Sequence, residues 1–307
     1  MNHDDAPFLG SAMWGEWVGE SEVYKILDTF YDSGFRNIDI ATNYPINGQD
    51  KNFKQAIIWL SNWCSVNQCN DLKIYLKIGS KTNHRTNEID LTPKFLKQEI
   101  NKNLDLFSTN LSTIGIHWDK RGASRKDIPA ISDTLESVYS FNRSNNLNIG
   151  FSGIEYPKLY KEALDFFDQK PIFQIKENLL SSKTRENYLK HFPKASFIAY
   201  GINLGSVKRE LDHEAFNNFI NKNILKKISS IKYKIEPLIE IKTLSELSIY
   251  FAAYNPNISS YIIAPSSAKQ LRSSIEFIKM IEKLNLTNEK KLMRYLKIKK
   301  LFRDEAN

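Results

Sequence analysis

Short runs of β-branched and aromatic residues alternate with longer amphipathic stretches along the whole chain. This alternation is typical of repeated βα units, which build a parallel sheet. The segments predicted as strands are Phe8–Trp14, Asn37–Ile40, Lys73–Ile78, Leu111–Ile116, Asn148–Ser152, Ile172–Lys176, Ser196–Tyr200 and Ser259–Ala264. Eight strands that are each followed by a helix predict an α/β fold of the closed (β/α)8 TIM-barrel type.

Helical periodicity fills most of the chain between these strands. The segments predicted as helices are Glu22–Ser33, Asp50–Cys64, Thr92–Phe107, Ile128–Asn145, Tyr156–Phe167, Glu186–His191, Thr243–Tyr254 and Ala268–Glu282, and an extra C-terminal helix is predicted over Thr287–Phe302. The basic, Asn-rich stretch 205–235 is interpreted as an excursion after the seventh strand.

A doubly wound open sheet is the alternative architecture, and its first strand would normally lead into a Gly-rich dinucleotide turn. No G-x-G-x-x-G pattern occurs in the chain. Barrels of this kind run to about 250 residues or more as one unit. We therefore expect residues 1–307 to form a single barrel domain.

Composition limits the classes of protein to which the chain can belong. The chain has 41% hydrophobic and 25% charged residues, which is ordinary for a globular protein. No apolar run approaches the roughly 20 residues that span a bilayer, and the polar segment 1–6 lacks the features of a secretory signal. We expect a cytoplasmic protein with no membrane partner.

The net charge of +8 attracts anions, but Lys and Arg are dispersed among Asp and Glu, and no nucleic-acid-binding motif occurs. Nucleic acid is therefore not an expected partner. The two cysteines, Cys64 and Cys69, have four residues between them and no accompanying His cluster. We interpret both as reduced and structural, and we expect no metal site.

Four polar side chains of complementary chemistry stand at or just after the ends of the second, third and fourth predicted strands. They are Asp39, Tyr44, Lys77 and His117. In a (β/α)8 barrel the carboxyl ends of the strands meet at one mouth, where active sites lie. We expect one catalytic site to contain all four.

These groups can transfer a proton to a carbonyl oxygen. A free phenol has a pKa of about 10, and a nearby ammonium lowers that pKa by favouring the phenolate. Lys77 would supply this charge for Tyr44, while Asp39 would be the counter-ion that a buried Lys77 requires. His117 could hydrogen-bond the substrate carbonyl and orient it.

The same segments resemble the aldo-keto reductase family from the first strand to the last helix. The stretch 34–44, Gly-Phe-Arg-Asn-Ile-Asp-Ile-Ala-Thr-Asn-Tyr, is similar to the best-known signature of that family, and 109–119 resembles its catalytic histidine segment. The stretch 9–15 resembles its first barrel strand without the usual N-terminal hairpin cap. The resemblance implies that Tyr44 is the proton donor, tuned by Lys77 and Asp39.

The resemblance also implies a nicotinamide cofactor, with NADPH expected ahead of NADH. Ser152 and Gln174 would bind the carboxamide, and Tyr200 would stack on the ring. Further cofactor residues are implied along two later segments, namely Leu204 and Ser206 at the pyrophosphate and Ser266, Ser267, Gln270 and Ser274 at the adenosine 2'-phosphate. The chain departs from the family pattern at Gly153 after Ser152, at Gly201-Ile202-Asn203 after Tyr200, and at the pair Ser273-Ser274.

We therefore expect an NADPH-dependent reductase of an aldehyde or ketone that acts as a monomer or weak homo-oligomer. Trp14 and Trp118 are expected to contact the carbonyl substrate. The loop 119–126 carries four cations, which makes a sugar, an anionic sugar or a nucleotide-linked sugar a candidate. The alternative is a regulatory or structural barrel that binds the nucleotide without catalysis.

Overall fold

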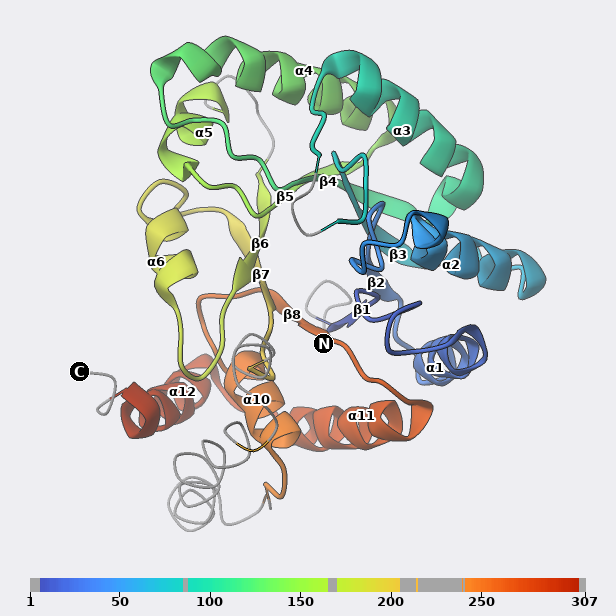
Figure 1. Cartoon of the computed structure of the whole chain (residues 1–307). Helices are drawn as coiled ribbons and strands as arrows, with labels where there is room; N and C mark the ends of the chain where they lie inside the picture. Colours follow the sequence, from blue (N-terminus) through green and yellow to red (C-terminus); the bar gives the residue numbers. More distant parts are fainter. Residues whose placement is uncertain are drawn as a thin grey trace.

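The computed structural model of the protein describes residues 6–84, 88–164, 170–204, 214, 239 and 241–303. Its centre is a closed barrel of parallel strands in the order β1 to β8 (Figure 1). The strands are β1 (Phe8–Gly10), β2 (Asn37–Ala41), β3 (Lys73–Ile78), β4 (Leu111–His117), β5 (Asn148–Ser152), β6 (Ile172–Lys176), β7 (Ser196–Tyr200) and β8 (Ser260–Ile263). The predicted (β/α)8 barrel is confirmed.

The helices form a ring around the strands, and α12 lies beside α10 at the end of the chain (Figure 1). They are α1 (Glu20–Asp32), α2 (Gln55–Val66), α3 (Pro93–Phe107), α4 (Ile128–Asn145), α5 (Pro157–Leu164), α6 (Lys183–Leu189), α10 (Leu244–Ala253), α11 (Ala268–Lys283) and α12 (Asn288–Arg303), with short 3-10 turns at η2 (Asp50–Asn52), η3 (Ser108–Asn110) and η4 (Arg125–Asp127). The extra C-terminal helix is confirmed as α12. The predicted excursion 205–235 lies, apart from Glu214, outside the described residues, as does the start of the chain at 1–5.

Most predicted elements differ from the structure only in their end residues, and two differ more. The first strand ends at Gly10 instead of Trp14, because the chain turns there and Trp14 N donates to Ser11 O at 3.1 Å. The predicted helix from Asp50 divides into η2 and α2, because Lys54 takes a left-handed conformation with φ 64°.

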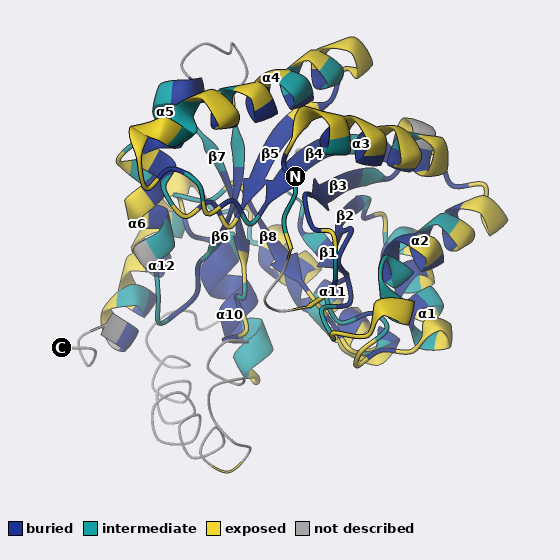
Figure 2. Ribbon diagram, turned by 45° about the horizontal axis from the view of Figure 1, so that its top comes forward, coloured by how far each residue is buried: buried dark blue, intermediate teal, exposed yellow. Residues whose placement is uncertain are grey.

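The elements form where apolar side chains can be buried on one face. In α1, Val23, Ile26, Leu27 and Phe30 are buried at helical spacing against the barrel. Figure 2 shows the same division throughout, with buried residues on the strands and exposed residues on the outward side of the helices. No helix in the described part of the chain is long and apolar enough to cross a bilayer.

Inside the barrel, Tyr75 of β3 packs with Ile198 and Ile262 from strands on the other side. Its ring faces two glycines, Gly115 in β4 and Gly150 in β5, and a Cβ on Gly115 would lie 2.5 Å from Tyr75 Cε1. These two positions are glycine because the phenol ring occupies the space that their side chains would need. The interior below the mouth is therefore filled, so a ligand can enter only from the strand ends.

Candidate active site

Lys77 lies at the centre of a buried polar cluster at the mouth of the barrel. Its Nζ lies 2.8 Å from the carboxylate of Asp39 on the neighbouring strand β2 and donates to Tyr44 Oη at 2.9 Å. Tyr44 follows β2, and its backbone N–H donates to Ala41 O at 3.2 Å, which turns the side chain over the mouth. The side chains of these three residues are at most 7% exposed.

Gln174 of β6 completes this cluster from across the barrel. Its Oε1 accepts a bond from Lys77 Nζ at 3.2 Å, and its Nε2 donates to Asp39 Oδ1 at 2.6 Å. Gln174 therefore holds both members of the ion pair. The resemblance pointed to Gln174 only as a carboxamide ligand, and no local sequence signal links it to residues 97 and 135 positions earlier.

The partners of Lys77 stabilise its positive charge. Burial lowers the pKa of Lys77, but the adjacent Asp39 carboxylate and Tyr44 outweigh burial and raise that pKa above its ordinary value. The side chain therefore remains an ammonium at neutral pH, next to the Tyr44 hydroxyl.

His117 ends β4 beside this group. Its ring lies edge-on to the Tyr44 ring, with 6.2 Å between the ring centroids. Burial, and then the positive charge of Lys77, hold the pKa of His117 well below its ordinary value, so the imidazole is neutral. Among the described residues, Nδ1 of His117 has no hydrogen-bond partner. A neutral imidazole carries one N–H that can donate to a carbonyl oxygen.

A cleft of about 600 Å³ opens next to the cluster. Its lining combines aromatic and apolar groups with a few polar ones, namely Ile89, Trp118, Lys120, Gly153, Ile154, Glu155, Gln174, Thr184, Asn187, Tyr188 and Tyr200. Gln174 belongs to both the cleft and the polar cluster, so a ligand in the cleft would lie against this cluster. The volume is in the range of small-molecule sites.

Trp118 forms one wall of this cleft in a left-handed conformation with φ 59°. The wall is close to Gly153, because a Cβ on Gly153 would lie 2.5 Å from Trp118 Cδ1. The departure from the family pattern at Gly153 therefore has a structural reason, since a side chain there would collide with the indole ring. Gly153 itself has φ 76°, which favours glycine.

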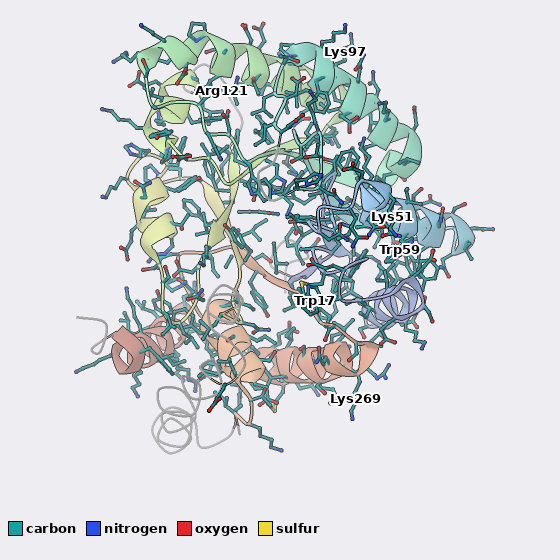
Figure 3. All side chains as sticks on the ribbon, in the orientation of Figure 1. Trp17, Lys51, Trp59, Lys97, Arg121 and Lys269 are labelled. Carbon is teal, nitrogen blue, oxygen red and sulfur yellow. The ribbon has the colours of Figure 1, made fainter. Side chains whose placement is uncertain are left out.

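The loop after Trp118 is fixed by a buried carboxylate. Asp119 is 1% exposed and accepts from Arg121 Nη2 at 2.7 Å, from Arg121 Nε at 3.0 Å and from the Tyr160 hydroxyl of α5. Arg121 also donates to Ala130 O and Thr134 Oγ1 of α4, each at 3.0 Å (labelled in Figure 3). Sequence reasoning missed this arrangement, which we call the Asp119–Arg121 clamp.

The clamp changes the interpretation of the four cations in the loop 119–126. Arg121 is paired with Asp119, and Arg125 Nη2 lies 2.7 Å from Glu162 Oε2. Lys120 alone of the four lines the cleft beside the polar cluster, and Glu155 lines it as well. The rim of that cleft thus carries both signs of charge.

The model of the aldo/keto reductase family matches residues 8–289 of the chain. The chain belongs to the aldo-keto reductase family. Among solved structures, the chain is similar to aldo-keto reductase AKR11C1 from Bacillus halodurans in its holo form, with a TM-score of 0.66 and 15% sequence identity over 97% of this chain and 92% of that one. That likeness shows the fold. A comparison with curated proteins gives no match.

As a member of this family, the protein is an NAD(P)H-dependent carbonyl oxidoreductase. The mouth of this aldo-keto reductase has groups that suit a nicotinamide ring. Tyr200 at the end of β7 is 36% exposed and lines the cleft, so one aromatic face is available for stacking. Ser152 ends β5 next to His117, with which it is in register.

The other cofactor residues implied by the resemblance lie farther along the barrel. Leu204 is fully buried with φ 59°, and Ser206 lies outside the described residues. Ser267 caps α11 by accepting from Gln270 N at 3.2 Å. Ser266 Oγ donates to Gln270 Oε1 at 2.8 Å.

The remaining residues predicted for the site lie in different surroundings. Ser274 is partly buried on α11. Of the two tryptophans expected at the substrate, Trp118 lines the cleft, whereas Trp14 is fully buried in the main apolar core. Cys64 and Cys69 are both buried and neither forms a disulfide.

Proposed function

We propose that the protein reduces an aldehyde or ketone to the alcohol, with Tyr44 as proton donor and a nicotinamide nucleotide as hydride donor. The observation that carries this proposal is the buried cluster in which Lys77 Nζ bonds both Tyr44 Oη and Asp39 at the base of a ligand-sized cleft. A bound nucleotide supplies the hydride. The residues of the chain supply the proton and the orientation.

Tyr44 donates its hydroxyl proton to the oxygen that becomes negative as the carbonyl is reduced. The negative charge left on Tyr44 Oη is stabilised by the ammonium of Lys77, 2.9 Å away. Because the site is buried, this charge pair is weakly screened by water and contributes more than a surface pair would. Asp39 and Gln174 keep Lys77 in place during the step.

His117 donates a hydrogen bond to the carbonyl oxygen and fixes its direction. Its neutral state matters, because a second cation beside Lys77 would compete with the proton donor and repel the ammonium. The indole of Trp118, whose ring centroid is 4.5 Å from that of His117, closes the substrate side of the site.

The nucleotide is held, in this proposal, along the ends of β5 to β8. Tyr200 stacks on the nicotinamide, while Ser152 and the Gln174 amide bind its carboxamide. The adenosine end lies at α11, where Ser266, Ser267, Gln270 and Ser274 gather. A second proton on Gln174 Nε2 remains for the carboxamide, because an amide nitrogen has two donors and Asp39 accepts only one.

A small polar carbonyl compound, such as a sugar, fits the cleft. Lys120, Glu155 and Asn187 provide hydrogen-bonding groups, and Ile154 and Trp118 provide apolar contact. A strongly anionic substrate is less favoured by this lining, because Glu155 offsets Lys120. The protein would carry out this reaction in the cytoplasm as a monomer or weak homo-oligomer.

The test is a Tyr44→Phe variant assayed for nucleotide oxidation with a panel of aldehydes, ketones and sugars, together with fluorescence titration of NADH and NADPH. We expect turnover to fall by a factor of about 100 or more, with nucleotide binding retained. Tyr24→Phe is the matched control, since it removes a hydroxyl that bonds Glu20 on the outer surface. Turnover by Tyr44→Phe at the wild-type rate would refute the assignment.

A further inference from the structure

The first turn of α11 is already occupied by a carboxylate of the chain itself. Ala268 N, the first N–H of the helix, donates to Glu22 Oε1 of α1 at 2.8 Å. Figure 1 shows α1 and α11 side by side on the outer ring. The unpaired N–H groups at a helix start favour an anion. Here Glu22 provides that anion.

Glu22 is charged in this position. The hydrogen bond from Ala268 N lowers the pKa of Glu22 below its ordinary value, and Lys25 Nζ, 3.6 Å from Glu22 Oε2, acts in the same direction. The side chain is 33% exposed, so it also borders solvent at the end of α11. A ligand that reaches the start of this helix meets a carboxylate.

Three other donors near the start of α11 are also paired within the chain. Ser266 N and Ser266 Oγ both donate to Gln270 Oε1, at 2.9 Å and 2.8 Å. Arg272 Nη1 donates to Thr29 Oγ1 of α1 at 3.4 Å, so this guanidinium rests against α1. Lys269, labelled in Figure 3, is exposed in the first turn.

The two nicotinamide nucleotides differ at the adenosine ribose, where NADH has a 2'-hydroxyl and NADPH a 2'-phosphate. A phosphate ester carries nearly two negative charges at neutral pH and needs free donors. Beside Glu22 it would lose the Ala268 N–H and be repelled by the carboxylate. A 2'-hydroxyl instead donates to a carboxylate, which is the way acidic residues select NAD in other dinucleotide sites.

We propose that Glu22 makes NADH the preferred nucleotide of this reductase. The inference rests on the proposed function, because it takes the adenosine ribose to lie at the start of α11. It reverses the preference for NADPH that the sequence resemblance implies. Glu22 acts as a specificity-determining residue on α1, outside every segment that the resemblance assigned to the cofactor.

The experiment is a fluorescence titration of NADH and NADPH against the wild type, Glu22→Gln and Glu20→Gln, without any carbonyl substrate. Glu20 is the matched control, because it lies in the same first turn and loses the same charge, but bonds Tyr24 on its own helix. Circular dichroism establishes that all three proteins are folded. Binding is read directly, so the result does not depend on finding the physiological carbonyl.

We expect the wild type to bind NADH at least about tenfold more tightly than NADPH, a difference of about 1.4 kcal/mol. Glu22→Gln should bind NADPH about tenfold more tightly than the wild type does, while Glu20→Gln keeps the wild-type ratio. Equal or tighter binding of NADPH by the wild type, or an unchanged ratio in Glu22→Gln, overturns this inference alone. Failure of the wild type to bind either nucleotide overturns the proposed function and this inference with it.

Discussion

Lys77 Nζ and Tyr44 Oη are 2.9 Å apart, and both groups are almost completely shielded from solvent. An ammonium in this position has no water to compensate its charge, so its partners in the protein must do so. Asp39 and Gln174 provide that compensation, and the same ammonium also donates to the Tyr44 hydroxyl. The cluster thus serves both the stability of the barrel and the proposed proton transfer.

Lys77→Met should abolish turnover and also destabilise the fold, because it leaves the Asp39 carboxylate buried without its counter-ion. Breaking such a pair costs about 3 to 5 kcal/mol of unfolding free energy. Urea denaturation measures the loss. Lys97→Met on the exposed face of α3 is the control, and a comparable loss there would show that the ion pair is not the cause.

Stability should depend on pH through His117. Its folded-state pKa lies well below the ordinary value of about 6.5, so the unfolded chain binds a proton that the folded barrel does not. The contribution of the neutral ring to stability is complete above pH 6.5 and is lost as the pH falls toward the folded-state pKa. The expected slope is about 1.4 kcal/mol per pH unit below about pH 6.5.

Denaturation curves of the wild type and His117→Asn between pH 8 and pH 5 test this dependence. The variant should lack this part of the slope. Above pH 7, the unfolding free energies of the two proteins should change in parallel with pH. Identical slopes below pH 6.5 would mean that the pKa of His117 is the same in the folded and the unfolded chain, and would contradict the lowered pKa.

The Asp119–Arg121 clamp should position Trp118 for the substrate. Arg121→Lys keeps the charge but loses the bidentate contact with Asp119 and the bonds to α4. A small displacement of the cleft wall can lower kcat/KM about 10- to 100-fold. We expect most of this loss to come from a higher KM for the carbonyl substrate. Steady-state kinetics with separate nucleotide titration measures both.

Arg125→Lys is the control for the clamp, because its pair with Glu162 is exposed and such surface pairs contribute little. Its kinetics should match the wild type. If Arg121→Lys also retained the wild-type KM for every carbonyl that is turned over, the clamp would have no part in positioning.

Gly150→Ala should destabilise the barrel, because the added methyl group would collide with the Tyr75 ring. Overpacking of this kind costs about 1 to 3 kcal/mol. Thermal or urea unfolding measures the loss, and the double variant Gly150→Ala, Tyr75→Leu should recover part of it. A double variant less stable than the sum of both single changes would contradict a steric origin.

Much of the barrel can be predicted from local pattern. The strands Lys73–Ile78 and Ile172–Lys176 and the helix Ile128–Asn145 have the predicted bounds, because apolar periodicity and flanking polar residues are local properties. The first strand is shorter than predicted, since Phe8–Trp14 is apolar on both sides of a turn that only the bond to Ser11 reveals.

The candidate site likewise contains residues that local sequence pattern predicts and contacts that it does not. Asp39, Lys77 and His117 could be found because they interrupt apolar strands at their carboxyl ends. The double role of Gln174 and the contact of Glu22 with Ala268 join residues 97 or more positions apart, and no spacing rule reports such contacts. Asp119 and Arg121 are neighbours in sequence, but only the position of Tyr160 on α5 shows that they face inward.

Gln174 joins β6 to the charged side chains on β2 and β3, so the proposed catalytic cluster is built from segments that are far apart in the sequence. A fragment that ends before β6 would contain the proposed proton donor Tyr44, together with Lys77, Asp39 and His117. It would lack Gln174, which bonds both members of the ion pair. The complementary fragment would contain none of the four. If the proposed roles hold, the site is complete only when both parts of the chain form one closed barrel, and turnover would then report on barrel closure.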